Sequence, residues 1–195
     1  MTAASVAVGQ NTGVSATFPM ARKGKPGYDV DEVETFLADA RRAYATLDGG
    51  GLTSDDIRHT AFRVVRREGY SVRHVDAALE RLEEAFAARE RDRAIAERGE
   101  EAFYRETREI AQEIVDRLAR PEGRRFRRAS ALARGYHPAD VDAFTARVSR
   151  YFQDGDPLTV DAVRTIAFRS RFGGYDETQV DVVLDAVIRV MLAVR

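Results

Sequence analysis

The 195-residue chain contains no cysteine. Without cysteine there is no disulfide framework and no thiolate chemistry, which suits a reducing cytoplasm. No apolar run is long enough to span a membrane, and residues 1–17 lack the basic start and sustained apolar centre of a signal peptide. The composition therefore predicts a soluble, cytoplasmic protein whose residues 1–17 form a flexible tail.

Signals for catalysis and for metal binding are equally scarce. The glycine-containing stretch 24–27 lacks the spacing and the following hydroxyl of a phosphate-binding P-loop. His59, His74 and His137 show no metal-ligand spacing. Carboxylates are plentiful, but no pair stands out as a general acid and base. We expect no enzyme activity, no catalytic residue, no metal site and no cofactor.

Lysine is almost absent, and nearly all of the positive charge is carried by arginine. The only lysines are Lys23 and Lys25, and the formal net charge is -1. Whole-protein electrostatics therefore does not indicate a nucleic-acid partner. The arginine excess reflects either bidentate binding of phosphate and carboxylate groups or codon bias.

A short kernel recurs four times with constant spacing: Gly-Tyr, four residues, Val and then an acid. The Gly, Tyr and Val of the four copies are Gly27, Tyr28, Val33, Gly69, Tyr70, Val75, Gly135, Tyr136, Val141, Gly174, Tyr175 and Val180. A step of five residues from Tyr to Val fits a hydrophobic staple across a helix N-terminus. We therefore expect a buried, structural role for Tyr70 and Tyr175, and a positive φ for the Gly before each Tyr.

If Tyr and Val form a hydrophobic staple, the residue directly after each Tyr is the N-cap of the following helix. These N-caps are Asp29, Ser71, His137 and Asp176. Glu32 and Gln179 stand where the third helical residue of a reciprocal capping box would lie, and Pro138 suits the first helical position. Leu-Thr pairs at 52–53 and 158–159 start a further short helix before the second and fourth copies. The expected unit is a capped short helix, a Gly-Tyr turn and a capped longer helix.

The arrangement of the copies predicts an all-α fold of four helical repeat units, arranged as two duplicated pairs joined by a charged helical connector. The expected segments are a tail at 1–17, a first pair at 18–90, a solvated connector at 91–122 and a second pair at 123–195. The Glu- and Arg-rich connector has a possible break at Gly99. The helix at 180–194 is apolar on all sides, so it must be central or form an oligomer face.

Each copy is basic before its Gly-Tyr and mostly acidic after it. The helix dipole explains acids in first turns, whereas the bases have no comparable structural explanation. The densest basic patch consists of Arg124, Arg125, Arg127 and Arg128. An arginine-bearing turn beside an aromatic would contact phosphates of lipid or nucleic acid, or would simply be solvated.

The fourth copy, from Leu158 to Leu184, reads L-T-x-D-x-x-R-x-x-x-F…F-x-G-Y-D-x-x-x-V-D-x-x-L. This pattern resembles the N-terminal unit of DivIVA-type proteins, which are bacterial scaffolds of cell division and polar growth. The second copy keeps most of the pattern, and the first and third keep Phe18, Phe126 and the kernel. The resemblance implies a helical unit that dimerises through its helices, in a cytoplasmic protein attached peripherally to the membrane. The charged connector would be a remnant of the family's long coiled coil, or a substitute for it.

The resemblance also implies candidate membrane contacts. In the family, the loop before Gly-Tyr carries an apolar residue and a neighbouring arginine that enter the bilayer surface. Phe172 stands at the apolar place in copy four, with Arg171 before it and Arg169 nearby. Copies one to three place Lys25, Arg67 and Ala133 there, which argues against insertion by those copies.

Two function classes follow from these observations. The first is a non-enzymatic scaffold or adaptor that self-associates, with cell-division or envelope proteins and an anionic membrane surface as candidate partners. The second is a nucleic-acid-binding helical protein that uses Arg-rich turns to contact phosphates; the net charge makes this class the less favoured one. An enzyme that uses helix carboxylates has no motif behind it.

Overall fold

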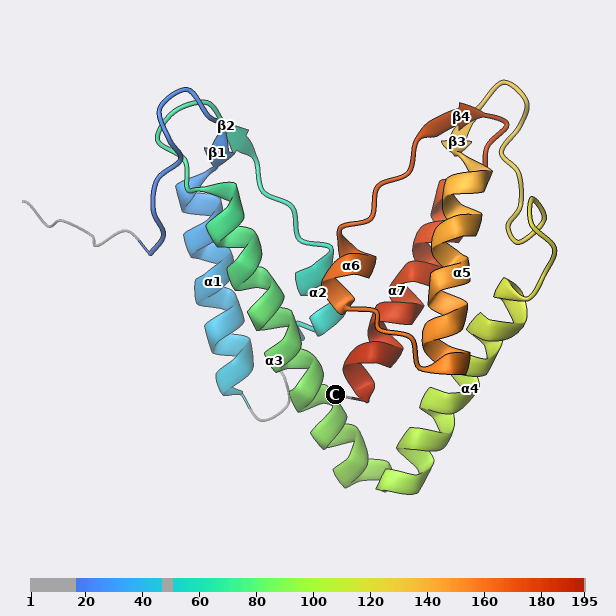
Figure 1. Cartoon of the computed structure of the whole chain (residues 1–195). Coiled ribbons are helices and arrows are strands. Elements are labelled where there is room, and N and C mark those ends of the chain that lie inside the picture. The colour runs from blue at the N-terminus through green and yellow to red at the C-terminus, as the bar shows by residue number, and fades with distance from the viewer. Residues whose placement is uncertain (1–16, 47–50, 195) are drawn as a thin grey trace, which may run out of the picture. The chain divides into compact units, whose positions relative to one another are not determined.

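The computed structural model describes residues 17–46 and 51–194 and is mainly α-helical (Figure 1). The chain divides into two compact units, with the division between Glu83 and Glu84. We call them unit 1 and unit 2. Two small sheets also form, so the expected all-α fold is confirmed only in the broader sense of a mainly α fold. Among the described residues, no helix is both long enough and apolar enough to cross a bilayer.

Unit 1 contains two short strands at one end of its helices (Figure 1). Its elements are β1 (Gly27–Tyr28), α1 (Val30–Ala45), α2 (Ser54–Arg58), β2 (Val64–Val65) and the first part of α3 (Val72–Arg98). β1 pairs with β2 in an antiparallel register that places Gly27 opposite Val65. Gly27-Tyr28 is therefore a strand and not the expected turn, while Tyr70 joins it through an isolated antiparallel bridge to Tyr28.

Unit 2 repeats this order of strand, helix, short helix, strand and helix. Its elements after the end of α3 are α4 (Glu100–Leu118), β3 (Arg134–Tyr136), α5 (Pro138–Asp154), α6 (Val160–Arg164), β4 (Ser170–Phe172) and α7 (Glu177–Ala193). β3 pairs with β4 in an antiparallel register that places Gly135 opposite Arg171. The two strands again lie at one end of the helices that follow them (Figure 1).

The helix starts follow the sequence prediction closely. The side chains of Asp29, Thr53, Thr159 and Asp176 each accept a hydrogen bond from a backbone N–H in the first turn of their helix. His137 is an N-cap without a side-chain bond, and proline follows it at the start of α5. These cap positions are confirmed, and at four of them a side chain satisfies a backbone N–H of the first turn.

The predicted capping boxes at Glu32 and Gln179 are wrong. The Glu32 carboxylate accepts a hydrogen bond from the backbone N–H of Arg63 at 2.7 Å, and the Gln179 amide oxygen accepts one from the N–H of Arg127 at 2.6 Å. These donors belong to segments that are distant in sequence and lie beside the helix start. The backbone N–H of each N-cap also donates to the same neighbouring segment, from Asp29 to the Arg63 carbonyl at 2.9 Å and from Asp176 to the Arg127 carbonyl at 2.8 Å. The N-cap N–H is therefore already bonded, and the reciprocal half of each capping box does not form.

The charged helix before the second pair is not a solvated connector. α4 packs against α5 and α7, and Ile114 and Leu118 are buried in the core of unit 2. Gly99, with φ of 86°, separates α3 from α4, as expected. The expected connector at 91–122 therefore contains a helix, α4, that packs within unit 2.

α7 is the central helix of unit 2. Its buried side chains are Val180, Val183, Leu184, Val187, Ile188, Val190, Met191 and Leu192. They contact apolar residues of α4, α5 and α6 in one cluster. Val182 and Val194 remain exposed. The expectation of a central helix is thus confirmed, and the apolar surface that was a candidate oligomer face is mostly used inside the unit.

Candidate functional site

The two Gly-Tyr segments of each unit bind each other through their backbones. In unit 1, the N–H of Tyr28 donates to the carbonyl of Tyr70 at 3.0 Å, and the N–H of Tyr70 donates to the carbonyl of Tyr28 at 2.8 Å. In unit 2, Tyr136 and Tyr175 exchange the same two bonds, also at 3.0 and 2.8 Å. Each unit is therefore closed by a reciprocal contact between two copies of the kernel.

The kernel glycines permit this close approach. They were expected to adopt positive φ, but none of them is among the positive-φ glycines of the described residues. A Cβ at Gly27 would lie 2.5 Å from the carbonyl oxygen of Tyr70, and a Cβ at Gly135 would lie 2.2 Å from that of Tyr175. Gly69 and Gly174 face the opposite segment in the same way. The glycine is required because two backbones meet, so the conformational explanation was wrong.

The acid of each kernel binds the tyrosine of the other copy. In unit 2, the Tyr175 hydroxyl donates to the Asp142 carboxylate at 3.0 Å, and the Tyr136 hydroxyl lies 3.5 Å from Asp181. In unit 1, the Tyr70 hydroxyl donates to Glu34 at 2.5 Å. Tyr28 hydrogen-bonds to Asp76. The constant spacing from Tyr to acid thus matches a contact between copies.

Burial determines the protonation of these pairs. It raises the pKa of Tyr136 and of Tyr175 to about 12, helped by the facing carboxylates. Burial also raises the pKa of Tyr28 and of Tyr70. The hydrogen bond from Tyr70 lowers the pKa of Glu34. At neutral pH the phenols are therefore neutral donors, which fits a structural role and not a proton-transfer role.

Each kernel tyrosine also packs against a phenylalanine from the partner copy. The centroid distances are 5.4 Å for Phe18 with Tyr70, 5.5 Å for Phe62 with Tyr28, 5.3 Å for Phe126 with Tyr175 and 5.2 Å for Phe168 with Tyr136. The kernel valines are fully buried beside them. The pairing thus combines backbone bonds, hydroxyl bonds and edge-on aromatic contacts.

Three arginines before the kernels have a repeated structural role. The guanidinium of Arg63 binds Asp29 at 2.6 Å, and that of Arg127 binds Asp176 at 2.7 Å. Arg169 binds Asp140 at 2.6 Å and lowers the pKa of that carboxyl to about 2. The expectation that the bases lack a structural explanation is therefore wrong for these residues. Arg169 in particular is engaged with a carboxylate, which weakens it as a membrane contact.

The sequence-predicted basic patch is mostly absorbed into unit 2. The Arg125 guanidinium donates to the Asp142 carbonyl at 2.7 Å and to the Thr145 hydroxyl at 3.0 Å. Arg128 donates to two glycine carbonyls and lies 5.0 Å from the centre of the Tyr175 ring. Arg127 is held by its aspartate, while Arg124 is exposed. The four arginines do not form one free phosphate-binding surface.

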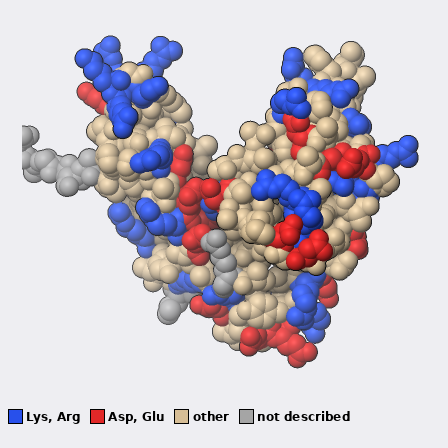
Figure 2. All heavy atoms as spheres, viewed as in Figure 1, with Lys and Arg blue, Asp and Glu red and all other residues tan. Residues whose placement is uncertain are grey.

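Each unit has a loop end, beside its Gly-Tyr strands. We define the unit 1 loop end as residues 20–27 and 64–69, and the unit 2 loop end as residues 128–135 and 170–174. Figure 2 shows basic side chains gathered at both. The two loop ends differ in the side chains that they expose.

The unit 2 loop end exposes two large apolar side chains. Phe172 is 58% exposed and Leu132 is 92% exposed. Gly173 donates a backbone hydrogen bond to the Ala133 carbonyl at 2.9 Å, which joins the two loops. The Arg134 guanidinium lies 4.6 Å from the centre of the Phe172 ring, and Arg171 is exposed beside it.

Sequence reasoning missed Leu132. The available signal was its place within Ala-Leu-Ala, the only apolar run in the arginine-rich stretch 124–134. When the copies are aligned on Gly-Tyr, Gly24 and Arg67 stand at the positions equivalent to Leu132 and Phe172. The large apolar side chains that the unit 1 loop end exposes are instead Met20 and Val64, at 46% and 59%.

Comparisons with known proteins identify no relative. No family model, no curated protein and no solved structure matches this chain. Within the part of the chain that the structure describes, no group of three or more histidines and acids is placed to hold a metal ion. The function must therefore be argued from the loop ends and from the pairing itself.

Proposed function

We propose that this protein is a non-enzymatic scaffold or adaptor of the DivIVA type, acting in cell division or polar growth at the inner face of the cytoplasmic membrane. It is built from four repeat units, with copy one paired to copy two and copy three paired to copy four. The family resemblance supplies the cellular process. The structure supplies the support for the pairing and for a candidate membrane contact.

The reciprocity of the kernel supports the four-repeat architecture. In each unit, each copy provides to the other a tyrosine carbonyl and N–H, a carboxylate and a phenylalanine ring. A motif whose parts are satisfied only by a second copy of itself is a pairing motif. Within one chain it produces two internal pseudo-dimers, which is the arrangement expected of a repeat scaffold.

The observation that carries the membrane proposal is the exposed pair Phe172 and Leu132 beside Arg134 and Arg171. Apolar side chains that project next to arginines suit an anionic bilayer surface. The two apolar groups would contribute about 3 kcal/mol when inserted, and the two arginines about 1 kcal/mol each near anionic lipid. The sum of about 5 kcal/mol corresponds to a dissociation constant of roughly 0.2 mM.

Such affinity is too weak to retain a monomer, so we propose that several copies act together through self-association. Linked sites convert weak single contacts into strong attachment. Because α7 is mostly used inside unit 2, its apolar surface is no longer the proposed oligomer face. The exposed Val182 and Val194 leave only a small part of it available.

The test is co-sedimentation of the full chain with vesicles of phosphatidylglycerol and phosphatidylcholine. We expect the wild type to pellet with anionic vesicles and the Leu132→Ser/Phe172→Ser variant to lose at least tenfold in affinity. Val64→Ser is the matched control, because Val64 is an apolar residue with 59% exposure at the unit 1 loop end. Equal sedimentation of wild type and the double variant would reject the membrane contact.

The nucleic-acid alternative is weakened by the contacts of Arg125, Arg127 and Arg128 within unit 2. Phosphate contacts require free cationic groups, and three of the four predicted ones are bonded internally. A fluorescent fusion in the native cell separates the two proposals. The scaffold proposal expects septal or polar signal, whereas nucleoid signal with salt-sensitive retention on DNA would favour the alternative.

A further inference from the structure

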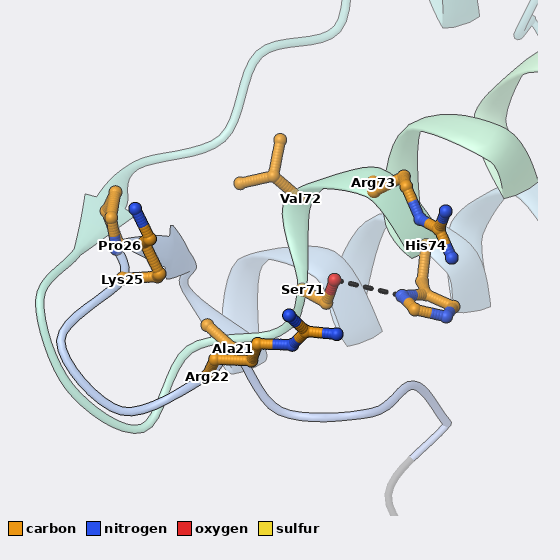
Figure 3. A pocket seen from close by; sticks show the side chains of 8 residues that line it. All are labelled: Ala21, Arg22, Lys25, Pro26, Ser71, Val72, Arg73 and His74. Carbon is orange, nitrogen blue, oxygen red and sulfur yellow. Dashed lines mark hydrogen bonds between the residues drawn. The ribbon is translucent and has the colours of Figure 1, made fainter.

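Unit 1 contains a cavity of about 410 Å³ between the loop at residues 21–26 and the start of α3. Figure 3 shows the loop on one side and the first residues of α3 on the other, with Arg22 extending toward Ser71 and His74 and with Lys25 beside Pro26 at the far end of the loop. The cavity lies wholly within unit 1, at its loop end. It is separate from the buried Gly-Tyr contact and from the exposed apolar pair of unit 2.

The lining of this cavity is strongly basic. It includes Arg22, Lys25, Arg73 and His74, and it contains no acidic residue. The Ser71 hydroxyl and the Nδ1 atom of His74 lie 2.9 Å apart in a hydrogen bond (Figure 3). Within the described residues, no ion pair involves Arg22, Lys25 or Arg73. The cavity therefore gathers cationic groups without the carboxylates that neutralise arginines elsewhere in the chain.

The contrast with unit 2 strengthens this point. Aligned on Gly-Tyr, the positions of Arg22 and Lys25 are Ser130 and Ala133 in unit 2, and the start of α7 carries Asp176 and Glu177. The first turn of α3 has no acid, whereas those of α1, α5 and α7 each have at least one. The shared backbone arrangement therefore does not require the positive charge of this cavity.

We propose that the unit 1 cavity binds a phosphomonoester or polyphosphate dianion. Arg22 and Arg73 provide guanidinium groups that bind phosphate oxygens in a bidentate way, and Lys25 adds a compact positive charge. The volume exceeds that of a single phosphate, so it accommodates pyrophosphate or a small phosphorylated head group. This inference goes beyond the proposed scaffold function and does not depend on it.

The direct test is isothermal titration calorimetry of the full chain with inorganic pyrophosphate. We expect saturable binding with a millimolar or lower dissociation constant, weakened at least tenfold in Arg22→Gln/Arg73→Gln. The matched control is Arg66→Gln/Arg67→Gln, which removes the same charge from exposed residues of the same loop end outside the cavity lining. The control should bind within twofold of wild type.

Absence of saturable binding would overturn the proposal, and so would an equal loss in the control variant. Because all four arginines are exposed, the variants should keep the wild-type melting temperature, which circular dichroism checks. A loss of binding at an unchanged melting temperature therefore reports on the cavity.

A second arm separates a free phosphate from a lipid head group. Vesicles containing phosphatidic acid, a phosphomonoester, are compared with phosphatidylglycerol vesicles of equal charge, using Leu132→Ser/Phe172→Ser protein to remove the unit 2 contact. Preference for phosphatidic acid, competed by pyrophosphate, supports a lipid source. Pyrophosphate binding without that preference supports a soluble source. If the protein binds neither pyrophosphate nor phosphatidic acid vesicles, the proposal is wrong, whether or not Leu132 and Phe172 prove to be membrane contacts.

Discussion

Unit 1 and unit 2 share a pairing geometry but present different chemistry at their loop ends. Both close through reciprocal tyrosine bonds of the same lengths. Unit 1 carries a basic cavity with Gly24 and Arg67 at its loop end, whereas unit 2 exposes Leu132 and Phe172 there. The comparison teaches that the kernel determines how two copies pair. Residues on both sides of the Gly-Tyr segments determine the chemistry that each loop end exposes.

The two units also differ in the size of their cores. The buried cluster around the kernel of unit 1 consists of Val33, Tyr70 and Val75 with partly buried neighbours. The cluster of unit 2 is much larger because it includes residues of α4, α6 and α7. Since apolar burial is the main stabilising contribution, we expect the same change in the kernel to unfold unit 1 more readily than unit 2.

The largest expected effect comes from removing a buried tyrosine. Tyr70→Ala and Tyr175→Ala should each destabilise their unit by about 4 kcal/mol, because the ring and its hydroxyl bond are both lost. Chemical denaturation followed by circular dichroism measures this loss. Tyr70→Ala should unfold unit 1 first and leave the unit 2 transition in place. Unchanged denaturation midpoints in both variants would contradict the buried role.

Gly135→Ala should destabilise unit 2 by about 3 kcal/mol, because the new Cβ would overlap the carbonyl of Tyr175. Gly155→Ala is the control, since Gly155 has φ of 74° and open space around it. The control should lose only about 1 kcal/mol, from the left-handed conformation. Equal losses in the two variants would contradict the account, because Gly135 does not have positive φ and only the approach of the second copy predicts the larger loss.

Alkaline pH should weaken the tyrosine pairs of unit 2. The pKa of Tyr175 and that of Tyr136 are raised to about 12, so the unfolded chain ionises first, near pH 10. Their contribution to stability is complete below pH 10 and disappears as pH rises from 10 to 12. Phenolate absorbance at 295 nm should show a late-titrating fraction, reduced in Tyr175→Phe. Complete titration by pH 10.5 in the folded protein would count against these pairs.

The smallest expected effect concerns the residue directly before the second kernel glycine of each unit, which is Gly69 in unit 1 and Gly174 in unit 2. Glu68 has φ of 55° where unit 2 has Gly173 at 61°. A side chain in this conformation costs about 1 kcal/mol, so Glu68→Gly should stabilise unit 1 by about that amount. Glu68→Ala removes the charge but keeps the strain, and should give no gain. Equal melting temperatures for Glu68→Gly and Glu68→Ala would contradict a cost of the left-handed conformation at this position.

The sequence predicted the features that depend on nearby residues. Helix starts at Asp29, Thr53, Thr159 and Asp176 follow from local capping chemistry, and the buried staple follows from a spacing of five residues. It predicted an all-α fold for the same reason, and the structure is mainly α with two small sheets.

Features that depend on distant segments were predicted less well. The partner of Glu32 is the backbone of Arg63, and the clash that requires Gly135 comes from Tyr175. Neither partner is visible within a sequence window. Leu132 was missed because exposure depends on how two loops meet, and α4 was taken as solvated because its narrow apolar face gives no sign of its packing partner.

The central claim is that copies of the kernel bind each other through their tyrosine backbones. The most direct measurement is hydrogen-bond scalar coupling in a long-range HNCO spectrum of the deuterated full chain. The account predicts correlations from the amide of Tyr28 to the carbonyl of Tyr70 and the reverse, with the same pair between Tyr136 and Tyr175. It also predicts slow hydrogen exchange at these four amides. Rapid exchange at all four, with none of these correlations, would contradict it.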